Sequence, residues 1–144
     1  MKLAFVGYGS IAEAHARALQ QLEDVQLVTV VGRRPEPTQQ FAEAFGFRRV
    51  VFDLADALAD EEIEAVVITS PSEQHAAQTG ACLRAGKHVL CEIPLAMNYA
   101  DAARVARRAE DSGRTLMVAH TQRFEPALIE LRRRVLAGEL NVHH

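Results

Sequence analysis

The sequence predicts a doubly wound α/β domain, in which helices cover both faces of one parallel β-sheet. Six short apolar runs are spaced along the chain, and a segment with helical features separates most of them from the next. Strands that alternate with helices in this way form parallel βαβ units with right-handed crossovers. A glycine-rich turn follows the first run directly, and 144 residues suffice for one ordinary domain.

The first expected strand covers residues 2–6, and after the glycine turn a helix runs to residue 19. The second expected strand is the β-branched run at 25–31. Apolar and β-branched residues gather again in the remaining expected strands, at 47–52, 65–69, 87–90 and 115–119.

The helices between these later strands are expected at 38–45, 54–58, 71–85 and 99–112. Ser70, Pro71 and Glu73 form the pattern of a capping box with proline at the first helical position. Asn98 is the expected N-cap of the last of these helices. Three of the helices are expected to end at Gly46, Gly86 and Gly113.

The last part of the chain differs from the alternating pattern. Residues 126–137 are expected to form an amphipathic helix, with Arg132, Arg133 and Arg134 on its solvated face and Gly138 at its end. Its apolar stripe consists of Leu128, Leu131 and Val135. Residues 140–144 then begin an extended segment, which we interpret as a native strand cut short; a purification tag is the alternative origin of the two final histidines.

Composition excludes several function classes. The formal net charge is −3 and tryptophan is absent, so no basic or aromatic surface for nucleic acid or an anionic membrane is expected. No run approaches the ~20 apolar residues of a membrane span, and the first run is too short for a signal peptide. We expect a cytoplasmic protein without a metal site, in which Cys82 and Cys91 are reduced. For Cys91 a reactive role is the alternative to a core residue.

The turn after the first strand has the layout of a dinucleotide site. Gly7 lets the chain turn off the strand, Gly9 lets a pyrophosphate approach the backbone, and Ala12 is small enough for close packing of helix on strand. Ser10 and Ile11 open the helix, whose free N–H groups and positive dipole end would face the phosphates. An ordinary tight turn between strand and helix is the alternative interpretation.

The end of the second strand predicts which dinucleotide binds. An NAD site places an acid there to hold the ribose 2′-hydroxyl, but this strand ends in Gly32, Arg33 and Arg34. Glycine removes the repulsion that an acid would exert on a 2′-phosphate, and two guanidinium groups can contact that phosphate. NADP is therefore the predicted cofactor. Two exposed turn arginines are the alternative.

Further candidate cofactor residues follow the fourth strand. Ser70 and Pro71 come directly after it, at the sheet edge where open α/β sheets bind ligands, and are expected to border the nicotinamide side of the cleft. His75 is one helical turn further on. A cofactor contact and a structural role are both open for His75, whereas His15, on the apolar face of the first helix, is expected to be structural.

Several ordered motifs resemble the glucose–fructose oxidoreductase/inositol dehydrogenase (Gfo/Idh/MocA) family over the whole chain. They are the glycine loop with His15, Ser70–His75, Ala85–Val89, Glu92–Ala96, His120–Phe124 and Gly138–Leu140. The resemblance implies hydride transfer to or from NAD(P), with the cofactor supplying the chemistry and the protein the positioning. It also implies that Glu92 contacts cofactor or substrate, and that the full-length protein forms a homo-oligomer.

One position departs from the family pattern. The family usually has a lysine between this Glu and the following Pro, where this chain has Ile93, which cannot transfer a proton. The motifs are similar to one branch of the family, the NADP-dependent 4-carboxy-2-hydroxymuconate-6-semialdehyde dehydrogenases of aromatic-acid breakdown. A substrate of that kind carries carboxylates, so Arg123 is the candidate carboxylate clamp and His120 the candidate proton-handling group. Structural roles for both are the alternative.

The resemblance also implies a two-domain protein. Residues 1–122 are expected to form the dinucleotide-binding Rossmann domain, and 123–144 a bridging helix and the start of a missing substrate domain. On this interpretation the chain alone binds NADP but does not turn over substrate. A stand-alone NADP-binding sensor or protein-docking module is the alternative function.

Overall fold

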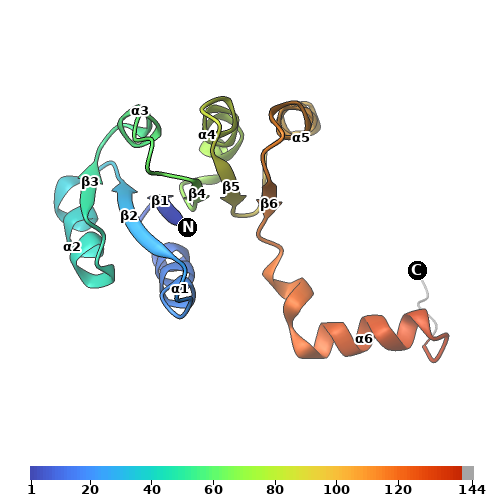
Figure 1. The fold of residues 1–144 in the computed structure, drawn as a ribbon. Coiled ribbons are helices and arrows are strands. Elements are labelled where there is room, and N and C mark those ends of the chain that lie inside the picture. Colours follow the sequence, from blue (N-terminus) through green and yellow to red (C-terminus); the bar gives the residue numbers. More distant parts are fainter. Residues whose placement is uncertain (141–144) are drawn as a thin grey trace.

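The computed structural model describes residues 1–140 and contains one six-stranded parallel sheet (Figure 1). Its strand order, β3-β2-β1-β4-β5-β6, is that of a doubly wound nucleotide-binding sheet. The strands are β1 (Lys2–Val6), β2 (Gln26–Val31), β3 (Arg49–Val51), β4 (Ala65–Ile68), β5 (His88–Cys91) and β6 (Leu116–Val118). The predicted fold class is therefore confirmed.

Helices cover both faces of this sheet. Helices α1 (Ser10–Leu19) and α2 (Pro35–Phe45) lie on one face (Figure 1). Helices α3 (Leu54–Leu58), α4 (Ser72–Arg84) and α5 (Tyr99–Ser112) lie on the other. A 3₁₀ turn, η1 (Thr121–Phe124), and helix α6 (Pro126–Leu136) follow β6.

The central strand β1 divides the core into two layers. Leu3 and Phe5 belong to the apolar cluster that includes α1 and α2, whereas Ala4 and Val6 belong to the cluster of α3, α4 and α5. This alternation is the period of two that a strand buried on both faces requires. Phe5 packs edge-on against Phe47, with ring centroids 5.3 Å apart, in the layer that holds α2 against the sheet.

Two helix starts differ from the prediction. Helix α2 begins at Pro35 rather than at residue 38, because a proline at the first helical position needs no N–H partner. The capping box predicted for α4 is wrong. Pro71 is the N-cap, and the Ser70 hydroxyl donates to the Gln78 side chain instead of accepting a bond from the helix. The predicted Asn98 cap is confirmed, because its side chain accepts from the Asp101 N–H.

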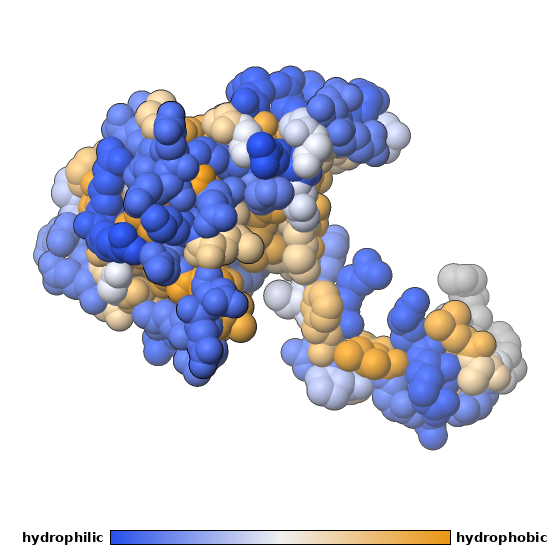
Figure 2. Space-filling view, in the orientation of Figure 1, coloured by the Kyte–Doolittle hydropathy of each residue, from blue (hydrophilic) through white to orange (hydrophobic). Residues whose placement is uncertain are grey.

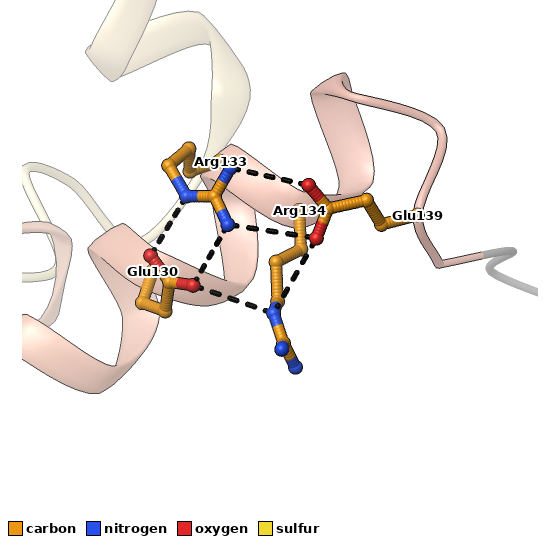
Figure 3. A network of polar contacts seen from close by, with 4 residues as sticks. All are labelled: Glu130, Arg133, Arg134 and Glu139. Carbon is orange, nitrogen blue, oxygen red and sulfur yellow. Dashed lines mark hydrogen bonds and ion pairs between the residues drawn. The ribbon is translucent and has the colours of Figure 1, made fainter.

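The predicted amphipathic helix α6 is confirmed, but its apolar stripe is not buried. None of its residues is buried, and Leu128, Ile129 and Leu131 are exposed. Figure 1 shows that α6 extends away from the sheet, and Figure 2 shows hydrophobic surface along this segment. Figure 3 shows the polar network at its end, where Glu130, Arg133, Arg134 and Glu139 pair with one another. Arg133 lowers the pKa of the Glu130 carboxyl below its usual range. The network links the last turns of α6 to Glu139 and involves no residue of the sheet.

Residues 141–144, where most of the final extended segment was expected, lie outside the described residues. No helix within residues 1–140 is long and apolar enough to cross a membrane. The same residues contain no group of three or more metal-ligating side chains that could hold an ion.

Candidate functional site

A cleft of about 1010 Å³ lies at the carboxyl ends of four neighbouring strands. The residues after β1, β2, β3 and β4 line it, together with two glutamines of α4. This is the edge at which open α/β sheets bind ligands. The lining residues are Val6–Gly9, Val31–Arg34, Phe52–Leu54, Thr69–Pro71, Gln74 and Gln78.

Gly7 forms the turn that leads from β1 into this cleft. Its φ is +109°, a conformation that costs any residue with a side chain, and a Cβ there would lie 2.8 Å from the Thr69 carbonyl oxygen. Its N–H donates to the Val31 carbonyl at 3.0 Å. Glycine is therefore required on both conformational and steric grounds, as the sequence predicted.

Gly9 leaves the start of α1 open to the cleft. It is the N-cap residue, nothing lies within 4 Å of where its Cβ would be, and no side chain among the described residues caps this helix. Ser10 and Ile11 are exposed in the first turn. The arrangement offers unpaired N–H donors and the positive dipole end to an anion, so the residues present fit a dinucleotide pyrophosphate.

The end of β2 forms the basic wall of the cleft. Arg33 and Arg34 are both exposed, and Arg34 Nε donates to the Tyr8 hydroxyl at 3.3 Å. This hydrogen bond raises the pKa of Arg34 above its ordinary value. Gly32, by contrast, is buried, and the first turn of α2 occupies the space beside it. The cleft's carboxylate, Asp53, is engaged in capping α3, where it accepts from the Ala55 N–H at 2.9 Å.

His75 lies beneath the cleft rather than in its lining. The side chain is 1% exposed, and its ring nitrogens lie 2.7 Å from the Ser70 carbonyl oxygen and 2.8 Å from that of Pro94. The ring thereby connects the segments that follow β4 and β5. This geometry supports the structural interpretation of His75, while Ser70 and Pro71 do line the cleft.

Glu92 contacts His15, for which the sequence predicts only a structural role. Its carboxylate lies 2.7 Å from His15 Nε2 and accepts from the Ile93 N–H at 3.0 Å. The two side chains are 14% and 11% exposed, so the contact joins α1 to the end of β5 in a nearly closed environment. Neither residue lines the cleft.

The candidate substrate residues lie apart from the cleft. His120 and Arg123 are both exposed at η1, and neither belongs to the cleft lining. The ion pairs among residues 1–140 include none between Arg123 and Glu92, which pairs with His15 instead. Ile93, at the position of the family lysine, is 50% exposed.

The two cysteines are buried, free thiols in the apolar cluster of α3, α4 and α5; Cys82 lies in α4 and Cys91 ends β5. Burial raises the pKa of Cys82 to about 12, and burial also raises the pKa of Cys91. A thiol in such surroundings is a poor nucleophile, which favours the core interpretation of Cys91 over a reactive role.

Several cleft residues were not predicted from the sequence. Tyr8 belongs to no binding motif of its own, and Gln74 and Gln78 are typical of ordinary helix positions. Phe52–Leu54 had a usable signal, because they follow a strand whose carboxyl end meets the same sheet edge.

Comparison with known proteins identifies the same kind of domain. A family model described as "Oxidoreductase family, NAD-binding Rossmann fold" matches residues 1–120. The 4-carboxy-2-hydroxymuconate-6-semialdehyde dehydrogenase of Sphingobium sp. is 37% identical over 142 residues, which are 99% of this chain and 45% of that protein. The scyllo-inositol 2-dehydrogenase (NADP(+)) of Bacillus subtilis is 30% identical over 141 residues, 97% of this chain and 38% of that protein.

Solved structures agree with these relatives. The WlbA dehydrogenase of Chromobacterium violaceum, in complex with NADH and UDP-GlcNAcA, superimposes with a TM-score of 0.88 at 31% identity. The match covers 93% of this chain and 39% of that one. The chain thus spans less than half the length of each of these relatives. It belongs to the Gfo/Idh/MocA oxidoreductase family and carries that family's NAD(P)-binding Rossmann domain.

Proposed function

We propose that this chain binds NADP(H) in the cleft and is the cofactor-binding domain of a dehydrogenase. The enzyme would transfer a hydride between NADP and a hydroxyl or hemiacetal carbon. The observation that carries the proposal is the pair of exposed arginines on the cleft wall, beside a buried glycine and without an acid at the end of β2. Guanidinium groups make strong, charge-assisted bonds to phosphate oxygens.

Each part of the cofactor has a matching part of the cleft. The pyrophosphate would lie over Gly9 and the first turn of α1, and the 2′-phosphate against Arg33 and Arg34. Ser70 and Pro71 would border the nicotinamide ring, whose C4 would accept the hydride in the oxidised cofactor and donate it in the reduced one. The name of the Bacillus relative, which includes NADP(+), supports this cofactor, whereas the Chromobacterium structure holds NADH.

For the substrate, we propose a carboxylate-bearing hydroxyl or hemiacetal compound. The name of the Sphingobium relative, a 4-carboxy-2-hydroxymuconate-6-semialdehyde dehydrogenase, supports this class. Arg123 is the proposed carboxylate clamp and His120 the proposed proton-handling group, because Ile93 has no titratable atom to exchange a proton. Glu92, which lies outside the cleft lining, is still proposed to contact cofactor or substrate from the end of β5.

Titration of arginine variants tests the proposal. Arg33→Ala and Arg34→Ala should each weaken NADPH binding about 10- to 100-fold, the value of one or two lost charge-assisted bonds, and leave NADH binding unchanged. Arg132→Ala, which removes an exposed arginine of α6, is the matched control and should change neither affinity. Equal losses for NADPH and NADH in the Arg33 and Arg34 variants would refute the 2′-phosphate assignment.

A further inference from the structure

Gly32 and Thr38 meet in a buried contact at the entrance to the basic wall. Thr38, in the first turn of α2, is fully buried. Its hydroxyl donates to the Arg34 carbonyl at 2.6 Å. A Cβ added at Gly32 would lie 2.6 Å from Thr38 Cγ2 and 2.8 Å from Thr38 Cβ, and closer still to Thr38 Oγ1.

Side-chain rotation cannot make this space. A turn about χ1 moves Oγ1 and Cγ2 of Thr38 but leaves its Cβ in place, so the 2.8 Å overlap remains. Gly32 itself is not in the left-handed region, so only the lack of space excludes a side chain there.

The backbone on both sides is also held. The Gly32 N–H donates to the Val51 carbonyl at 3.1 Å, which ties the end of β2 to β3. Helix α2 is anchored by its buried residues Phe41, Ala42 and Phe45. Any separation of α2 from β2 therefore disturbs a close-packed aromatic layer, which resists such a shift.

Position 32 lies at the strand end where an acidic side chain would bind the ribose 2′-hydroxyl of NAD. In dinucleotide folds that bind NAD, an Asp or Glu at this strand end accepts from the 2′-hydroxyl. We propose that Thr38 is a specificity-determining residue. It leaves no room for a side chain at position 32, so no acid can bind the ribose 2′-hydroxyl there, and a 2′-phosphate bound by Arg33 and Arg34 is favoured instead. The inference rests on the proposed function, because it presumes that NADP binds there.

A stability cycle without cofactor tests the steric part. Gly32→Ala should lower the Tm by about 5 °C or more, since overpacking a close-packed site is destabilising. In the Thr38→Gly background, which removes all three overlapping atoms, the same change should cost less than half as much. Equal losses of Tm in the two backgrounds would overturn the inference.

Cofactor titration tests the specificity part. Gly32→Asp with Thr38→Gly should shift the preference from NADPH toward NADH at least about tenfold, whereas Gly32→Asp with Thr38 intact should lose stability without that shift. Thr38→Ala is the intermediate background, because it removes Oγ1 and Cγ2 but keeps the Cβ at 2.8 Å, and should therefore give a smaller shift than Thr38→Gly. A stable Gly32→Asp variant that gains NADH binding with Thr38 in place would overturn the role of Thr38.

These outcomes differ from failure of the proposed function. The unaltered chain alone reports that function, through its ratio of NADPH to NADH affinity. The coupling between positions 32 and 38 is read from the Tm values of the unaltered chain, the two single variants and the double variant without any cofactor, so it can fail while NADPH binding persists.

Discussion

Replacing His15 with alanine tests whether the contact between His15 and Glu92 stabilises the packing of α1 against the end of β5. The change removes the 2.7 Å contact to Glu92 and leaves that carboxylate, 8% exposed as a residue, with the Ile93 N–H as its remaining donor among the described residues. A nearly buried charged group that loses one of two partners costs about 2–3 kcal/mol. At roughly 4 °C per kcal/mol for a chain of this size, the Tm should fall by roughly 8–12 °C.

Thermal unfolding followed by circular dichroism measures this loss, and His120→Ala is the matched control. His120 is exposed, so its removal should change stability by no more than about 0.5 kcal/mol. A His15→Ala, Glu92→Ala double variant should lose less than the sum of the two single losses, because the pair is removed as a unit. If His15→Ala costs no more than His120→Ala, or the losses add, the His15–Glu92 contact does not anchor the end of β5.

Two further predictions concern helix α4 and the buried thiols. Gly80→Ala should raise the Tm by about 2–4 °C, because the nearest atom to its Cβ would be Arg84 Nη1 at 3.7 Å and alanine favours the helix. Gly86→Ala, at φ +73°, should lower the Tm instead; a loss in both variants would refute the propensity argument. Burial raises the pKa of Cys82 from its ordinary value of 9.0 to about 12, so its contribution to stability is complete below about pH 9 and is lost as the pH rises toward 12. Ellman's reagent at pH 8 should therefore label neither cysteine of the folded chain and both in urea, and rapid labelling of the folded chain would contradict the burial.

The strands could be predicted because their apolar runs are local and almost continuous. The central runs at β1 and β4 are buried on both faces, so no alternation had to be resolved. Helix starts were less predictable. The cap of α4 depended on whether the Ser70 hydroxyl would accept from a backbone N–H in the first turn, and it instead donates to the side chain of Gln78, about two turns along the helix.

The candidate site was predictable where its signal lies within one loop. Gly7, Gly9 and the two arginines come shortly after the ends of β1 and β2, so their position in the cleft could be predicted. The His15–Glu92 contact joins residues 77 apart, and no local pattern reports such a pair. Gly32 was interpreted through the cofactor alone, because the approach of Thr38 depends on how α2 packs.

Calorimetric titration of the chain with NADPH and with NADH tests the central claim most directly. The basic wall at the end of β2 predicts that NADPH binds at least about tenfold more tightly, since the 2′-phosphate adds one or more charge-assisted bonds that NADH cannot make. Equal affinities, or tighter binding of NADH, would contradict the assignment of Arg33 and Arg34 to the 2′-phosphate.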